Sequence, residues 1–132
     1  MALLKKNKKE LVLTRESLLE KEILEVVKVD LDNNQIVYVR QMTGHERDKF
    51  ESLLVTKVKK GKTFDFEQNL EDFRAKLAVS CLCDEEGALL LKSEDYKTLS
   101  QNMSAFRLEK IVNVAQKINK ISDEDKEELI KN

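Results

Sequence analysis

Proline and tryptophan are absent from this chain of 132 residues, and glycine occurs only three times, at Gly44, Gly61 and Gly87. Loops that cradle phosphate need several glycines close together, because side chains would keep the backbone away from the phosphate. The sequence therefore excludes the dinucleotide fingerprint and the P-loop. We expect no nucleotide or other cofactor.

Cysteine and histidine are nearly as scarce, with Cys81, Cys83 and His45 as their only representatives. A structural zinc site needs four ligands, and on a helix the spacing of Cys81 and Cys83 would turn their side chains about 200° apart. A cysteine nucleophile would need a local signature, which is missing. We expect Cys81 to fill the core on the face of Leu77, and His45 to be exposed in the first turn of a helix. No catalytic or metal site is predicted, and hence no enzyme.

Long apolar runs and a large net charge are missing as well. No stretch reaches the roughly eighteen apolar residues of a membrane span, and "MALLKKNKKELVL" lacks the apolar core of a signal peptide. Charged residues make up 37% of the chain, yet the net charge is −1. We therefore expect a cytoplasmic protein that binds neither membrane nor nucleic acid. The lysine-rich segments "KKNKK" and "KVKKGK" leave one alternative, a small DNA-associated regulator that contacts phosphates.

The clearest strand pattern is "VVKVDLDNNQIVYVRQM". Val27 and Val29 alternate with charged residues, residues 32–34 tolerate positive φ, and a β-branched run follows at 36–39. This pattern predicts an antiparallel hairpin at about 26–41.

Two capping boxes predict helix starts, Ser17 with Glu20 and Thr43 with Glu46. The first helix would carry an apolar stripe of Leu18, Leu19, Ile23 and Val26. The second would begin at Gly44 and His45 and carry Phe50, Leu53, Leu54 and Val58 on one face. After a basic loop at 59–63, "FDFEQN" leads to a third helix with Leu70, Phe73, Leu77 and Cys81 on its face.

The pattern of the residues after Cys81 predicts mainly helix. "CDEEGALLL" breaks at Gly87 and suits a short strand, and Ser93 begins a helical turn. The strongest helical stripe consists of Phe106, Leu108, Ile111, Val112, Ala115 and Ile118. A last helix is expected from Ser122, with Leu129 and Ile130 late in it.

These elements predict a single α+β domain over residues 1–132, with residues 1–13 as a mobile arm. One antiparallel β-hairpin would pack with four or five helices, and the C-terminal half would be mainly helical. The expected core includes Phe50, Leu54, Phe73, Leu77, Leu108, Ile111, Val112 and Ala115.

Three stretches resemble the tail assembly chaperones of tailed bacteriophages and prophages, small proteins encoded just before the tape measure protein. They are "TRESLLEKEIL", "VYVRQMTGHERDKFE" and "DEEGALLLKSEDYKTLSQNMSAFRLEKIVNVAQKINKISDEDKEEL". A strand ending in Val-Arg, then Thr-Gly and Glu-Arg-Asp, recurs in that family. The corresponding residues here are Val39, Arg40, Thr43, Gly44, Glu46, Arg47 and Asp48. Two departures are the turn at 32–34, where many relatives carry Trp-Gly, and Leu91, where phenylalanine is usual.

The resemblance implies a non-enzymatic chaperone that keeps the tape measure protein soluble in the cytoplasm of the bacterial host and is absent from the mature virion. It also implies self-association, and contact with the major tail protein through a longer, frameshifted form. The end of the chain inside an incipient helix would suit the shorter product. We expect an apolar partner-binding surface, with Leu89, Leu90, Leu91, Leu129 and Ile130 as candidates.

Overall fold

In the computed structural model, which describes residues 9–68 and 71–122, the predicted hairpin forms two strands of an antiparallel sheet. The strands are β1 (Val26–Asp30) and β2 (Ile36–Arg40), and the short strand β5 (Leu82–Cys83) pairs with the other edge of β2. Asn33 and Asn34 have φ of 57° and 59°, the left-handed values that a tight hairpin turn requires. The predicted hairpin is confirmed.

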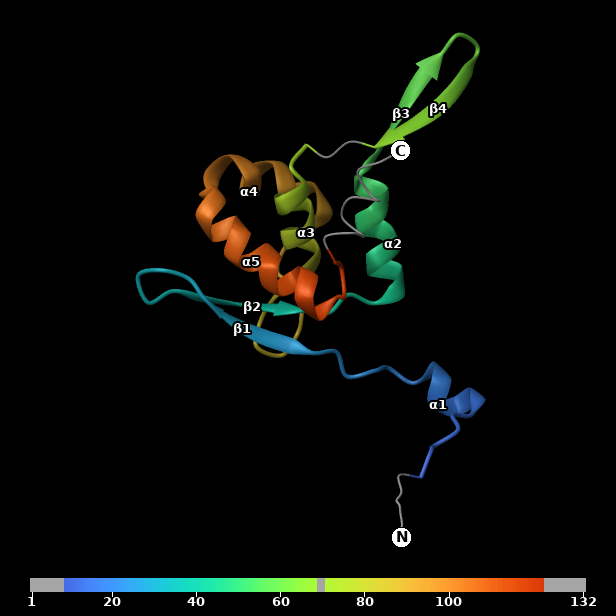
Figure 1. Cartoon of the computed structure of the whole chain (residues 1–132), viewed down its shortest axis with the longest axis vertical. Coiled ribbons are helices and arrows are strands. Elements are labelled where there is room, and N and C mark those ends of the chain that lie inside the picture. Colours follow the sequence, from blue (N-terminus) through green and yellow to red (C-terminus); the bar gives the residue numbers. More distant parts are fainter. Residues whose placement is uncertain (1–8, 69–70, 123–132) are drawn as a thin grey trace.

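Helices cover this sheet and complete an α+β fold, as predicted (Figure 1). Helix α5 contacts both β1 and β2, and α3 contacts α2, α4 and α5. Short 3₁₀ helix η1 leads directly into α4. The bounds of these elements are α2 (Gly44–Leu53), α3 (Phe73–Cys81), η1 (Ser93–Asp95), α4 (Tyr96–Asn102) and α5 (Ala105–Ile118).

The core lies between the sheet, α3 and α5, and every residue that the sequence assigned to it is buried. Val37 and Val39 of β2 stand opposite Val29 and Val27 of β1, so this face of the hairpin is apolar. The helical stripes supply the rest, because residues three and four apart share a face. The predicted core residues are Phe50, Leu54, Phe73, Leu77, Leu108, Ile111, Val112 and Ala115.

Helix α5 is tied to the hairpin at its N-terminal end. The Arg107 Nε donates to Asp32 Oδ1 at 2.7 Å, and a guanidinium nitrogen also reaches the Asp32 carbonyl oxygen at 3.3 Å and the Gln35 side chain. Phe106, expected in the apolar stripe, is 61% exposed instead. It lies in the first turn of α5.

A second hairpin corrects the interpretation of residues 55–68. The helix expected to include Val58 ends at Leu53, and strands β3 (Val55–Lys60) and β4 (Thr63–Gln68) replace the expected basic loop and helix start. Alternation of β-branched residues with lysine in β3 favours a strand, and Gly61 supplies the positive φ of the turn. Figure 1 shows this β3–β4 ribbon projecting from the body. Leu70 is outside the described residues.

The N-terminal helix is shorter and begins earlier than expected. Helix α1 (Arg15–Leu19) is capped by Thr14, whose Oγ1 accepts the Ser17 N–H at 3.3 Å, while Ser17 Oγ accepts the Thr14 N–H at 2.7 Å. Ser17 is therefore the third residue of a capping box that starts at Thr14, and the box expected from Ser17 with Glu20 is wrong. Val26 belongs to β1, and the last expected helix lies mostly in residues 123–132, outside the described residues.

Candidate functional site

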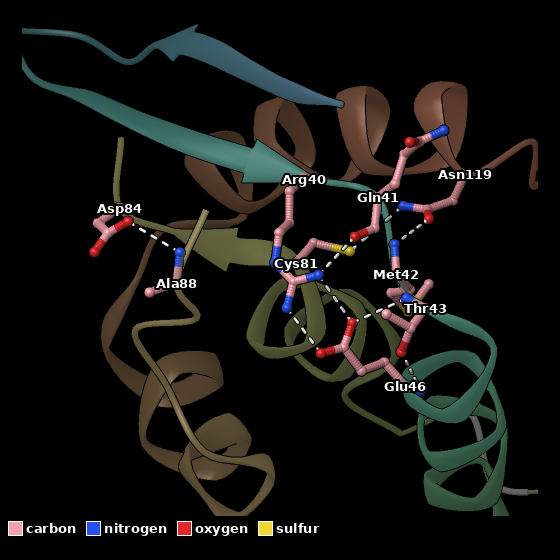
Figure 2. A network of polar contacts seen from close by, with 9 residues as sticks. All are labelled: Arg40, Gln41, Met42, Thr43, Glu46, Cys81, Asp84, Ala88 and Asn119. Atoms are coloured by element: carbon pink, nitrogen blue, oxygen red, sulfur yellow. Dashed lines mark hydrogen bonds and ion pairs between the residues drawn. The ribbon is translucent and has the colours of Figure 1, made fainter. Parts of the chain in front are cut away.

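The motif residues that carry the family resemblance meet where β2 ends and α2 begins (Figure 2). Arg40 is 7% exposed, and its two terminal nitrogens donate to the Glu46 carboxylate at 2.9 and 2.7 Å. Val39 is fully buried beside it, and Arg47 forms a half-exposed pair with Glu51. Gly44, His45 and Asp48 are exposed.

Glu46 also closes the predicted capping box. Its Oε1 accepts the Thr43 N–H at 2.9 Å, and Thr43 Oγ1 accepts the Glu46 N–H at 3.1 Å. Burial raises the pKa of Glu46, but hydrogen bonds from Arg40 and Thr43 outweigh it and hold the pKa of this carboxyl below its usual value. The carboxylate is therefore ionised at neutral pH, and it fixes the direction in which α2 leaves the sheet.

The C-terminal end of α5 joins the same place. The Met42 N–H donates to Asn119 Oδ1 at 2.7 Å, and the Gln41 amide donates to the Ile118 carbonyl oxygen at 3.2 Å. Asn119 Nδ2 in turn donates to the Ala115 carbonyl oxygen and contacts the Cys81 sulfur at 3.6 Å. We call residues 40–46 with Asn119 the polar junction. It connects the sheet, α2 and α5, so its role in the structure is to hold the fold together.

The residues considered for metal or thiol chemistry are not brought together. His45 is exposed on α2 as predicted, whereas Cys81 and Cys83 are both buried. Burial raises the pKa of Cys81 to about 12 and also raises the pKa of Cys83. The expected helical geometry of the two cysteines is wrong, since α3 ends at Cys81 and Cys83 lies in β5. Within the described part of the chain, no three His, Cys, Asp or Glu side chains gather as a metal site would require.

A partly exposed apolar strip is formed by three of the candidate partner-binding residues, Leu89, Leu90 and Leu91, and we call it the leucine ridge. Leu89 is 36% exposed and Leu90 60% exposed, while Leu91 is half-buried against the core. Backbone hydrogen bonds fix this segment, because the Leu90 N–H donates to the Leu82 carbonyl oxygen at 3.1 Å. Leu129 and Ile130, the other candidates, lie outside the described residues.

A tight turn precedes the leucine ridge, and Figure 2 shows the bond between its residues Asp84 and Ala88. Asp84 Oδ1 accepts the N–H groups of Glu86 and Ala88, each at 2.9 Å. Gly87 has φ of +93°, and a β-carbon at this position would lie 3.5 Å from Val26 Cγ2 and 3.8 Å from Arg40 Cδ. Residues 84–87, with which the third stretch of the resemblance begins, thus form a turn that leads into the leucine ridge.

Two cavities flank the leucine ridge and share Leu91. The first, which we call the α4–α5 groove, has a volume of about 570 Å³ and an apolar floor. Its lining includes Leu91, Thr98, Leu99, Asn102 and Met103. The second, of about 540 Å³, is more polar and is lined by His45, Lys49, Val79, Leu89, Leu91 and Lys92 among others.

Sequence patterns did not reveal the α4–α5 groove, Gln41 or Asn119. The groove forms where two helices meet, and the two amides act across long sequence separations. Leu99 and Met103 are four residues apart, a spacing typical of one face of a helix. This spacing was the one sequence feature that pointed to the α4–α5 groove.

Comparison with known proteins adds no assignment, since no family model, curated protein or solved structure matches the chain. Among the described residues, no helix combines the length and apolar character needed to cross a bilayer.

Proposed function

We propose that this protein is a tail assembly chaperone that binds a phage tape measure protein and keeps it soluble during tail assembly. The support from sequence is the resemblance in residues 14–24, 37–51 and 84–129. The observation that carries the proposal is the leucine ridge, an exposed apolar strip beside an apolar groove on an otherwise highly charged chain. Exposed apolar strips of this kind are typical of sites that receive another protein.

The groove suits an amphipathic helix, which places apolar side chains at every third or fourth position. Met103 at its floor is unbranched and adapts its shape, so different apolar side chains can be accommodated. A tape measure protein is long, largely helical and apolar, and would offer many such segments. We further propose that the chaperone is non-enzymatic, acts in the cytoplasm of the bacterial host, is absent from the mature virion and contacts the major tail protein through a longer, frameshifted form.

Co-expression with the long helical protein encoded downstream tests this proposal. We expect the partner to stay soluble and to be retained with the chaperone at both low and high salt, because apolar burial depends little on ionic strength. Leu90→Gln should weaken retention, since Leu90 is exposed and its loss leaves the core intact. The exposed Lys97→Gln is the matched control and should leave retention unchanged. An insoluble, unbound partner would exclude the chaperone function.

A second candidate, a DNA-associated regulator, is favoured by the β3–β4 ribbon. Lys57 and Lys59 stand opposite Phe66 and Phe64 in its register, and the exposed Lys62 follows in the turn. A two-stranded ribbon fits the major groove of DNA, and phosphate contacts weaken steeply as salt rises. Salt-sensitive retention of DNA, together with failure to bind the downstream partner, would select this candidate.

A further inference from the structure

The α4–α5 groove carries one charge of each sign, and the two charges stand at different places along its length. Among the described residues that line the groove, Asp95 is the one acid and Arg107 the one base. Asp95 directly precedes α4, and Arg107 lies in the first turn of α5, past the end of α4. Because α4 has seven residues, it separates these two places by about 10 Å.

The first hairpin holds Arg107 in place, yet part of its guanidinium is left for another partner. Its Nε and Nη2 donate to Asp32 and Gln35, whereas no acceptor among the described residues is bonded to Nη1. The Arg107 side chain is 24% exposed. Its hydrogen bond, and also the charge of Lys110, hold the pKa of the Asp32 carboxyl below its usual value. Two cations thus share one carboxylate, so this end of the groove keeps a positive charge.

A backbone hydrogen bond fixes Asp95 at the other end of the groove. Its Oδ2 accepts the Lys92 N–H at 2.8 Å, and within the described part of the chain Oδ1 has no hydrogen-bond partner. The lysines nearest in sequence, Lys92 and Lys97, are exposed and do not line the groove. The carboxylate therefore presents its negative charge to an occupant of this end.

These two fixed charges restrict the kind of helix that fits the groove. The floor between them is apolar and includes Leu99 and Met103, so it suits an apolar pair three or four positions apart on an incoming helix. Residues seven positions apart on a helix share a face and lie about 10 Å apart. A basic and an acidic residue at that spacing would reach Asp95 and Arg107 together, whereas two acids or two bases would bring one like-charge contact.

We propose that the α4–α5 groove selects helices by charge, and that its preferred helix has an apolar pair flanked by one basic and one acidic residue seven positions apart. This inference rests on the proposed chaperone function and specifies which segments of the tape measure protein the groove would hold. Because hydrogen bonds already fix both groove charges, little ordering is needed when the helix docks. Helices with two like charges are rejected by repulsion.

Labelled helical peptides that differ only at the two flanking positions test this inference by fluorescence anisotropy. The base–acid peptide carries one lysine and one glutamate there, the acid–acid peptide two glutamates and the base–base peptide two lysines. At low salt the wild-type protein should bind the base–acid peptide about three- to tenfold more tightly than either of the others, because one charge pair is gained and one like-charge contact avoided. High salt should reduce this preference without abolishing binding, since it screens charges and leaves apolar burial intact.

The variant Asp95→Asn separates the contributions of the two ends. Asparagine keeps an oxygen that accepts the Lys92 N–H, so the fold is retained. The base–acid and acid–acid peptides should then bind within about twofold of each other, while the base–base peptide should stay weaker because Arg107 still repels it. Arg107 is left unchanged because it also ties α5 to the hairpin. Asp30→Asn, at an exposed carboxyl on β1, is the matched control and should keep the wild-type preference.

Two results would overturn the inference and leave the chaperone function standing. They are equal binding of the three peptides by the wild type, and an unchanged preference in Asp95→Asn. Failure of every peptide to bind would also overturn it, since the groove would then not receive helices of this kind. The proposed function fails separately, when the downstream partner is neither retained nor kept soluble in co-expression.

Discussion

Breaking the ion pair at the polar junction should cost much more stability than breaking a surface pair of similar length. The Arg40 and Glu46 side chains are only 9% and 22% exposed and lie 2.7 Å apart. Glu46→Leu would leave the buried guanidinium without its carboxylate, and removing one member of a buried pair costs about 3–5 kcal/mol. Arg40→Met should cost about 1–3 kcal/mol, because Glu46 keeps part of its solvent contact and its bond to Thr43.

In the double variant Arg40→Met with Glu46→Leu, the loss in free energy of unfolding should be about 2–3 kcal/mol smaller than the sum of the losses in the two single variants. The reason is that the double variant leaves no buried charge without a partner. The matched control is Arg74 with Glu109, which are 2.6 Å apart but 51% and 44% exposed. The same double-mutant cycle there should give a coupling energy below about 1 kcal/mol.

Urea unfolding followed by circular dichroism measures these differences, as shifts of the midpoint at constant slope. Circular dichroism is suitable because the chain has no tryptophan for fluorescence. A coupling energy at Arg40 and Glu46 no larger than that of the surface pair would refute the reasoning, since it would mean that burial adds nothing to the pair.

Three further predictions concern stability in acid, the core, and the side chains of His45 and Cys81. In the folded protein the pKa values of Glu46 and Asp32 lie below their usual values, that of Asp32 chiefly because of its hydrogen bond with Arg107. Both carboxylates therefore add to the free energy of unfolding above about pH 4.5, and this contribution is lost as the pH falls through the folded pKa values. In urea titrations the free energy of unfolding of Glu46→Gln should fall less steeply with decreasing pH than that of the wild type, and an equally steep fall would count against this. Leu54→Ala and Ile111→Ala should each lower the free energy of unfolding by about 2–5 kcal/mol in urea, because both side chains are buried; losses below about 1 kcal/mol would contradict their place in the core. His45→Gln should stay within about 0.5 kcal/mol of wild type, and a thiol reagent should modify Cys81 only after unfolding, given its burial and raised pKa; rapid modification of the folded protein would show that the thiol is accessible.

The sequence predicted the core and the first hairpin well because both depend on local periodicity. Ile111 and Val112 lie on a long helical stripe, and Asn33 and Asn34 suit a turn with positive φ. The β3–β4 ribbon was missed because the lysines on either side of Val58 give this short alternating stretch the composition of a charged loop. Composition alone does not distinguish a lysine-rich strand from a charged loop.

The candidate site was only partly predictable. The leucine ridge was visible as a run of apolar residues after a glycine break, but the sequence could not show how far Leu90 protrudes. The pairing of Arg40 with Glu46 depends on how the chain turns from β2 into α2, and the sequence pattern does not specify that turn. Asn119 had no distinguishing neighbours in sequence, and its importance comes from the hydrogen bond that it accepts from the Met42 N–H.

The hydrogen bond between Met42 and Asn119 joins residues 77 positions apart, and this separation affects how the protein folds during its synthesis on the ribosome. The hairpin and α2 can form early during synthesis, yet their junction stays open to water until Asn119 has emerged. At about 5–20 residues per second, several seconds separate the two events. During that interval the apolar face of β1 and β2 has no α5 to cover it, so general chaperones of the cell are expected to bind the nascent chain.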